Sequence, residues 1–206
     1  MRDVDAVPAC MIDVAFALEG DALPREHRGL LAAALVAALP WLAEVPGAGV
    51  HRLNVSAGGG PQALLSGRTR LTLRVPRERA ADAMTLSGRE LLLGESRLRV
   101  GAAHVRELLP YSALYAHLVA TDDVDEVAFV EAVHTELKAL EVACRAICGR
   151  HQVTEAGAIQ GYSLMLDGLN AAHSLRVLEA GLGPHRRLGC GLFVPHKSSV
   201  AVGTPA

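Results

Sequence analysis

Residues 68–76 read RTRLTLRVP, and the pattern of this stretch decides how the rest of the chain is interpreted. Apolar and polar side chains alternate strictly, which predicts a half-buried β-strand. The polar face of such a strand usually contacts water, so we expect its basic side chains to be solvated. One face carries Leu71, Leu73 and Val75, and the other carries Arg70, Thr72 and Arg74.

Similar patterns on both sides of this strand predict the order β-α-β-β-α-β for the first half of the chain. Alternating segments bounded by turn residues indicate strands, and apolar residues spaced three and four apart indicate helices. The other elements are expected as a strand at residues 11–18, a helix from Leu23-Pro24 to about Leu39, a strand at 50–55, a helix from Pro76 to about Leu86, and strands around 91–93 and 98–100.

The second half of the chain repeats this order. Two consecutive β-α-β-β-α-β units predict an α+β fold of tandem ferredoxin-like (RRM-like) domains. We place them at residues 1–109 and 110–206, joined near Leu109-Pro110-Tyr111. The elements are expected as a strand at 114–120, a helix at 122–140, strands at 145–153 and 160–166, a helix at 171–180 that ends at Gly181, and a closing strand at 190–194.

The composition is that of a folded protein with unevenly distributed charge. The 206 residues are 50% hydrophobic and carry a net charge of −2, which argues against a tail-driven polyanion binder. Residues 61–121 and 142–206 are nevertheless basic, whereas residues 122–141 are strongly acidic. All cationic residues except Lys138 and Lys197 are arginines, which suit phosphate and base contacts, although a GC-rich coding sequence explains the same bias.

The N-terminus and the cysteines point to a cytoplasmic protein without a cofactor. The start MRDVDAVPAC lacks the apolar block of a signal peptide. The longest apolar stretch, Gly29 to Ala43, is shorter than the ~20 residues of a membrane span, so we expect no membrane partner. Cys144 and Cys148 have no second pair at zinc-binding spacing, so we expect reduced thiols and no metal site.

A glycine-rich segment near the C-terminus, GLGPHRRLGCGLFVPHKS at 181–198, is a candidate phosphate-binding loop. Glycines let backbone N–H groups approach a phosphate closely. The spacing matches neither the P-loop nor the dinucleotide fingerprint, and a tight turn explains the glycines equally well. Two Gly-x-Gly pairs flank a basic linker: Gly181 and Gly183, then Gly189 and Gly191, around His185, Arg186 and Arg187.

This loop, at the end of a tandem ferredoxin-like chain, resembles that of the CRISPR-associated endoribonuclease family that processes repeat RNA. Other stretches resemble the compact branch of that family, in matching order over nearly the whole chain. They are FALEGDALPREHRGLLAAAL (16–35), GAGVHRLN (47–54), RTRLTLRVP (68–76), ICGRH (147–151), GYSLMLDGL (161–169) and GLGPHRRLGCGLFVPHK (181–197).

The resemblance implies a reaction and a set of partners. The reaction is metal-independent cleavage of the repeat in precursor CRISPR RNA, in which a 2′-hydroxyl attacks the adjacent phosphate and leaves a 2′,3′-cyclic phosphate and a 5′-hydroxyl. The product is expected to stay bound through the crRNA 3′ handle, together with the other subunits of a type I effector complex (Cascade). A non-catalytic RNA-binding subunit of the same kind of complex is the alternative.

The resemblance also places a catalytic histidine in or just after the first helix, where this chain has His27 and His51. Histidine suits both proton-transfer roles because its pKa of ~6.5 lies near the operating pH. We expect the two to form the base and acid pair, with the assignment open. By position alone, each could equally be a surface or capping residue. Many family members use Tyr, Lys or Ser as the partner; this region has no Tyr or Lys, so a second His or an Arg would take that part.

Basic residues are the expected RNA contacts. Arg28 or Arg52 could stabilise charge on the scissile phosphate, or simply form surface ion pairs. The four glycines and three basic residues of the loop, together with Lys197, are the main RNA-binding candidates, and Arg145 and Arg150 extend them. Arg68, Arg70 and Arg74 are weaker candidates, because a polar strand face usually contacts water. The histidines at 104, 117, 134 and 173 have no partner spacing and are interpreted as structural.

Overall fold

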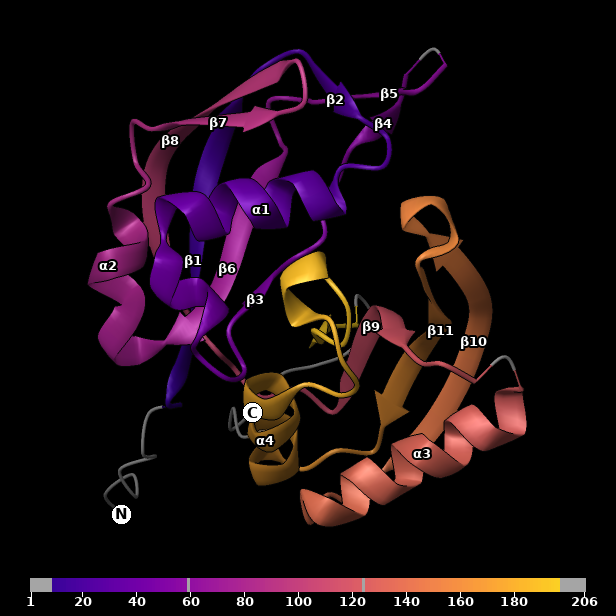
Figure 1. Ribbon diagram of the computed structural model, residues 1–206. Helices are drawn as coiled ribbons and strands as arrows, with labels where there is room; N and C mark the ends of the chain where they lie inside the picture. The colour runs from indigo at the N-terminus through magenta and orange to yellow at the C-terminus, as the bar shows by residue number, and fades with distance from the viewer. Residues whose placement is uncertain (1–8, 59, 124, 197–206) are drawn as a thin grey trace, which may run out of the picture.

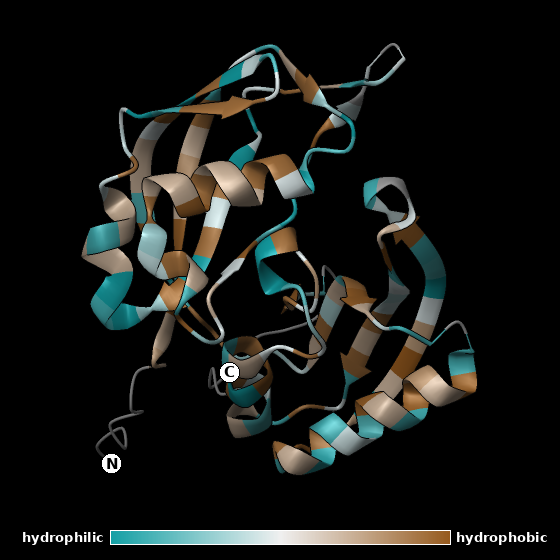
Figure 2. Ribbon diagram, viewed as in Figure 1, coloured by the Kyte–Doolittle hydropathy of each residue, from teal (hydrophilic) through white to brown (hydrophobic). Residues whose placement is uncertain are grey.

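The computed structural model describes residues 9–58, 60–123 and 125–196. Figure 1 shows two halves, each a sheet with helices packed against it, and the segment that follows α4 lies between them. Figure 2 shows that many strand residues are hydrophobic, whereas the η4 turn between the halves is largely hydrophilic. No helix in the described part of the chain is long and apolar enough to cross a membrane.

The first half contains a five-stranded antiparallel sheet in the order β3-β6-β1-β8-β7. Its core centres on β1 and β6, where side chains such as Phe16 and Leu73 are fully buried. A small sheet, β2-β5-β4, lies at the outer end. The elements are β1 (Met11–Glu19), β2 (Ala22–Pro24), α1 (Arg28–Ala38), η1 (Pro40–Ala43), β3 (Gly49–Val50), β4 (Ser56–Ala57), β5 (Gln62–Leu64), β6 (Arg70–Pro76), η2 (Arg77–Arg79), α2 (Ala80–Met84), β7 (Glu90–Leu93) and β8 (Ser96–Glu107).

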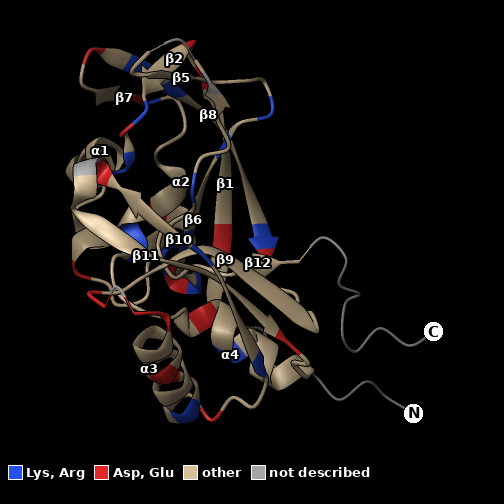
Figure 3. Cartoon of the chain, turned by 90° about the vertical axis from the view of Figure 1, so that its right-hand side faces the viewer, with Lys and Arg blue, Asp and Glu red and all other residues tan. Residues whose placement is uncertain are grey.

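The second half contains a four-stranded antiparallel sheet in the order β10-β11-β9-β12. Its core joins α3 and α4 to the sheet around Phe129 and Phe193. The acidic residues of 122–141 lie on and around α3, at the opposite end of the molecule from β2, β4 and β5 (Figure 3). The elements are β9 (Ala113–Ala120), α3 (Glu126–Ala139), β10 (Arg145–Thr154), η3 (Glu155–Gly157), β11 (Ile159–Asp167), α4 (Ala171–Ala180), η4 (Arg186–Leu188) and β12 (Val194–Pro195).

The two sheets confirm the tandem ferredoxin-like prediction. In each half, the second, third, first and fourth strands of the β-α-β-β-α-β order lie side by side, with β7 added at the edge of the first sheet. The proposed division at 109/110 falls between β8 and β9 and remains a prediction.

Several predicted boundaries differ from the structure, and three of them have a clear physical reason. The first helix begins at Arg28 and not at Leu23, because residues 22–24 pair with β5 as a strand. The strand expected at 50–55 ends at Val50; the N–H of His51 makes one more hydrogen bond to β6, at Thr72 O, and the chain then leaves that strand. The closing strand is 194–195, because Gly191 has a positive φ of +67° and its carbonyl oxygen accepts from Leu182 N–H in the loop, which interrupts the extended pairing with β9.

Glycines allow the segment after α4 to fold back on itself. Gly181 ends α4 at φ +63°, and Gly191 has φ +67°. The N–H of Leu182 donates to Gly191 O at 3.1 Å. A methyl group on Gly191 would overlap the carbonyl oxygen of Leu182, so this close approach requires glycine.

Arg74 joins the two halves and corrects the prediction that its face of β6 contacts water. Its side chain is 2% exposed, because α4 and the segment before β12 cover it. Nε and Nη2 donate to the Asp13 carboxylate at 2.8 and 2.9 Å. Nη1 donates to the carbonyl oxygens of Leu178 and Phe193 in the second half, at 2.9 and 3.0 Å. The guanidinium is therefore bonded on all sides.

We expect Arg74→Met to lower the free energy of unfolding by about 3–5 kcal/mol, because it leaves the Asp13 carboxylate largely buried without its partner. Urea unfolding measures this loss. Arg77→Met is the matched control, since Arg77 makes a similar two-pronged contact with Glu107 at the surface and should matter much less. The double variant Asp13→Asn/Arg74→Met should lose less than the sum of the single losses; additive losses would contradict the coupling.

The same pair makes stability depend on pH in a defined direction. Burial alone would raise the pKa of Asp13, but His51 and Arg74 more than compensate and hold it well below its usual range. The contribution of the Asp13–Arg74 pair to the free energy of unfolding is then fully present above about pH 5 and is lost only in strong acid. The difference in unfolding free energy between wild type and Asp13→Asn should therefore be constant from pH 7 to 8, where His51 is neutral, and shrink below pH 4. A difference that disappears near pH 6 would be inconsistent with this pairing.

Gly191→Ala should destabilise the protein by more than Gly168→Ala. Both positions have positive φ, which costs an alanine about 1–2 kcal/mol. Nothing lies within 4 Å of a methyl group on Gly168, so only Gly191→Ala adds a clash with backbone. Thermal unfolding of the two variants measures the difference, and equal losses would show that the loop relaxes around the methyl group.

Candidate active site

The two predicted catalytic histidines lie on one small cleft between the halves. His27 directly precedes α1, and His51 follows β3. The wall opposite them comes from η4 and the glycine that ends it. The cleft is lined by His27, Arg28, Leu31, Val50, His51, Arg52, Leu53, Arg187, Leu188 and Gly189. Residues from three separate stretches of the chain thus meet here.

His27 is buried, with 7% of its surface exposed, so it is not the surface residue that its position alone allowed. Its Nδ1 lies 3.0 Å from the carbonyl oxygens of Pro24 and of Arg25. A carbonyl oxygen only accepts, so Nδ1 carries the hydrogen and the neutral ring keeps its lone pair on Nε2. Burial lowers the pKa of His27, although these contacts oppose the shift.

His51 faces an aspartate that the sequence analysis missed. Its Nε2 lies 3.4 Å from Oδ1 of Asp13, without the geometry of a good hydrogen bond, and its side chain is 13% exposed. Burial lowers the pKa of His51, and the nearby Arg74 lowers it further, while Asp13 acts in the opposite direction. The one available signal for Asp13 was a single acid within the otherwise apolar strand MIDVAFAL.

Arginines surround the histidines, but they differ in exposure and in hydrogen bonding. Arg28 is half-buried, and its Nη1 donates to Leu188 O at 3.0 Å. Arg52 is exposed, and its Nη1 lies 3.4 Å from Nδ1 of His117 on β9. Arg187 is exposed on η4. His117, interpreted from the sequence as structural, therefore belongs to this cluster, and no local sequence pattern pointed to it.

A larger cavity of about 540 Å³ adjoins the cleft and shares His51, Arg52 and Gly189 with it. Its walls come from both sheets and from the connection between β8 and β9. Its lining is basic on balance: Asp13 and Glu107 stand against five arginines, of which Arg74 is paired with Asp13, and the others are Arg52, Arg68, Arg70 and Arg106. Such a cavity suits a polyanion.

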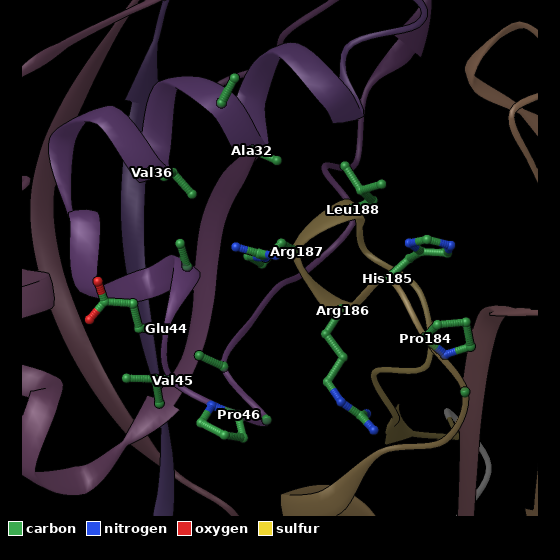
Figure 4. Close-up of a pocket in the computed structure, with 15 residues that line it drawn as sticks. Ala32, Val36, Glu44, Val45, Pro46, Pro184, His185, Arg186, Arg187 and Leu188 are labelled. Carbon is green, nitrogen blue, oxygen red and sulfur yellow. The ribbon is translucent and has the colours of Figure 1, made fainter.

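The glycine-rich loop forms one wall of a groove of about 630 Å³, and α1 and η1 form the other. Figure 4 shows Arg187 directed toward α1, while Arg186 points away from it. Arg186 is half-buried, and burial lowers its pKa. Its Nη1 is buried and has no hydrogen-bond partner among the described residues. Of the two predicted loop arginines, Arg187 is therefore the one freely presented to a ligand.

Other predicted RNA contacts lie apart from the cleft. Arg145 and Arg150 are on β10, at the far edge of the second sheet, and Arg145 pairs with Asp167 at 2.6 Å. His185 is exposed at the start of η4, with φ +65°. Lys197 lies outside the described residues. Within the described ranges, no three His, Cys, Asp or Glu side chains gather closely enough to hold a metal ion.

Comparison with known proteins identifies the family. A family model described as Cas6 Crispr matches residues 12–198. The CRISPR-associated endonuclease Cas6 of Myxococcus xanthus (strain DK1622) is 37% identical over 187 residues, which cover 89% of this chain and 81% of the relative.

Solved structures share the fold at low sequence identity. A CRISPR-associated protein Cas6 superposes with a TM-score of 0.61 at 10% identity, covering 91% of this chain and 100% of that one. A Cas6-related protein from Pyrococcus furiosus gives 0.60 at 13% identity, covering 91% and 99%. The resemblance noted in the sequence is confirmed: this chain belongs to the Cas6 family of CRISPR proteins.

Proposed function

We propose that this protein is an endoribonuclease that cleaves the repeat in precursor CRISPR RNA without a metal ion. The observation that carries the proposal is the convergence of His27 and His51, with Arg28, Arg52 and Arg187, on one cleft between the two halves. The Myxococcus xanthus relative, a CRISPR-associated endonuclease, supports the same reaction class. Two histidines can supply both proton transfers of such a reaction.

The geometry favours His27 as the base and His51 as the acid. The Nε2 lone pair of His27 accepts the proton of the 2′-hydroxyl as the 2′-oxygen attacks phosphorus. The bond from phosphorus to the 5′-oxygen breaks, and His51 donates a proton to that oxygen. Asp13 favours the protonated form of His51, and a bound phosphate would add to this effect. The products are a 2′,3′-cyclic phosphate and a 5′-hydroxyl.

Basic and glycine-rich segments would hold the RNA. Arg28 and Arg52 lie beside both histidines and can neutralise charge on the scissile phosphate. The loop from Gly181 to Gly191 would contact phosphates through Arg187, His185 and backbone N–H groups. Arg145, Arg150 and Lys197 would contact more distant parts of the repeat. The cleaved RNA would stay bound by its 3′ handle, in contact with other subunits of a type I effector complex.

One observation favours the alternative, a non-catalytic RNA-binding subunit. The histidine cleft has a volume of only about 10 Å³, whereas the adjoining basic cavity has about 540 Å³. A protein with this geometry could bind RNA in the larger cavity without exposing His27 to a 2′-hydroxyl. Cleavage therefore requires that the RNA, or a movement of the loop, open the smaller cleft.

His27→Ala and His51→Ala should each slow single-turnover cleavage of the protein's own repeat RNA by about 10²–10⁴-fold, the usual contribution of a general acid or base. The assay uses end-labelled RNA in EDTA and maps the product termini. His134→Ala on α3, away from the cleft, is the control and should cleave at the wild-type rate. Two histidine variants that both cleave at the wild-type rate would refute this pair, and tight binding without cleavage by wild type would select the alternative.

Burial of His27, the proposed base, determines the pH at which kcat/KM falls on the acid side of the pH–rate profile. The pKa of His27 is lowered, and a base must be unprotonated, so kcat/KM should stay high below pH 6.5 before it falls. The profile is measured from pH 4.5 to 8 under single-turnover conditions, with enzyme in excess of RNA but below the concentration that saturates binding. An acid limb with its midpoint above pH 7 would contradict the assignment of His27.

A further inference from the structure

A third histidine faces the basic cavity and has no part in the proton transfers above. His117 lies on β9 in the second half, and it lines the cavity together with His51 and Arg52. Both histidines of the proposed base–acid pair come from the first half. Among the described residues, His117 is the one histidine of the second half that lines this cavity. The following inference rests on the proposed function.

The contact with Arg52 fixes which hydrogen bonds His117 can make. Nη1 of Arg52 lies 3.4 Å from Nδ1 of His117, a long contact. A guanidinium only donates, so Nδ1 is the acceptor and the neutral ring carries its hydrogen on Nε2. Burial lowers the pKa of His117, and the charges of Arg52, Arg28 and His51 lower it further. The ring is therefore a neutral N–H donor at physiological pH, and it is unsuited to act as a proton-transferring acid.

The surroundings also hold the ring in place. Tyr115 contacts it edge to face, with ring centroids 5.0 Å apart and an interplanar angle of 82°. The carbonyl oxygen of His117 accepts a hydrogen bond from Gln152 Nε2 at 2.6 Å, which ties β9 to β10 at this position. A donor that is fixed before the substrate arrives is the arrangement that stabilises developing charge most effectively.

We propose that His117 is a catalytic residue whose Nε2–H donates a hydrogen bond to a non-bridging oxygen of the scissile phosphate. The bond strengthens as the 2′-oxygen attacks, because negative charge then builds on the non-bridging oxygens. Arg52 positions the imidazole through Nδ1 and contributes charge to the same phosphate. No proton is transferred in this contact, so the base–acid roles of His27 and His51 are unchanged. The reacting phosphate would thus be held between the two halves.

The test compares His117→Ala with His117→Gln on the protein's own repeat RNA, under single-turnover conditions in EDTA. The amide nitrogen of glutamine can present an N–H close to the position of Nε2. We expect His117→Ala to cleave about 10²–10³-fold more slowly, as for loss of one oxyanion donor, and His117→Gln to recover at least a tenth of the wild-type rate. Binding to repeat RNA with a 2′-deoxy group at the cut site should change less than about five-fold, because the contact strengthens in the transition state. His134→Ala is again the control.

Sulfur substitution locates the contact. Repeat RNAs with sulfur in place of one or the other non-bridging oxygen of the scissile phosphate should slow the wild-type enzyme for at least one stereoisomer. The same substitution should slow His117→Ala much less, because sulfur is a poor acceptor and the variant has no donor to lose. Equal sulfur effects in wild type and variant would overturn the inference.

The remaining outcomes separate this inference from the proposed function. Wild-type cleavage with an unchanged rate in His117→Ala overturns the role of His117 and leaves the nuclease intact. A loss confined to RNA affinity, with an unchanged rate for bound RNA, also overturns it, since His117 would then contact RNA elsewhere. Failure of wild type to cleave overturns the proposed function and this inference together. If His117→Ala does not fold, as judged by thermal unfolding, folded His117→Phe, which keeps an aromatic ring but has no N–H, takes its place. A slow rate with a reduced sulfur effect in that variant supports the contact, and a wild-type rate or a wild-type sulfur effect overturns it.

Discussion

The arrangement of the two halves depends on the buried guanidinium of Arg74. It pairs with Asp13 within the first sheet and donates to two carbonyl oxygens of the second half. One acceptor, Leu178 O, belongs to the last turn of α4, where carbonyl groups have no partner within the helix and favour a cation. A buried ion pair is weak evidence for stability by itself. Here its geometric effect matters more, because Asp13 also faces His51, so one carboxylate links the domain contact to the active-site cleft.

A second set of hydrogen bonds joins the halves at the other end of the cleft. The N-cap residue of α1 is His27, and its side chain makes no capping hydrogen bond to the helix. Instead, Glu155 of the second half accepts hydrogen bonds from the backbone N–H groups of Arg28 and Gly29 at 3.0 and 3.1 Å. A carboxylate at this position also suits the helix dipole. The residue before α1 is therefore positioned by the opposite half, and the cleft exists only when both halves are docked.

These long-range contacts explain which features could be predicted from the sequence and which could not. The helix 171–180 matches α4 at both ends because its signals are local: Asn170 caps it through His173 N–H, and Gly181 ends it. The predicted start of α1 was wrong because residues 22–24 pair with β5 and because the carboxylate that caps the helix, Glu155, lies 127 residues away in the chain. Alternation in RTRLTLRVP correctly predicted a strand, but it could not reveal that α4 covers Arg74. Likewise, His27 and His51 were found through the family resemblance, whereas Asp13 and His117 join the cluster only in three dimensions.

Protonation and RNA binding are coupled in such a site. Burial lowers the pKa values of His27, His51 and His117, so the free protein holds neutral imidazoles beside several arginines. Neutral rings add no positive charge to a cleft that already holds several arginines, so they add no repulsion between like charges there. In the proposed reaction, an entering phosphate offsets the arginine charge and favours protonation of the histidine that Asp13 supports. The acid would then form where the substrate is bound, while His27, held by two carbonyl oxygens, would keep its lone pair as the base.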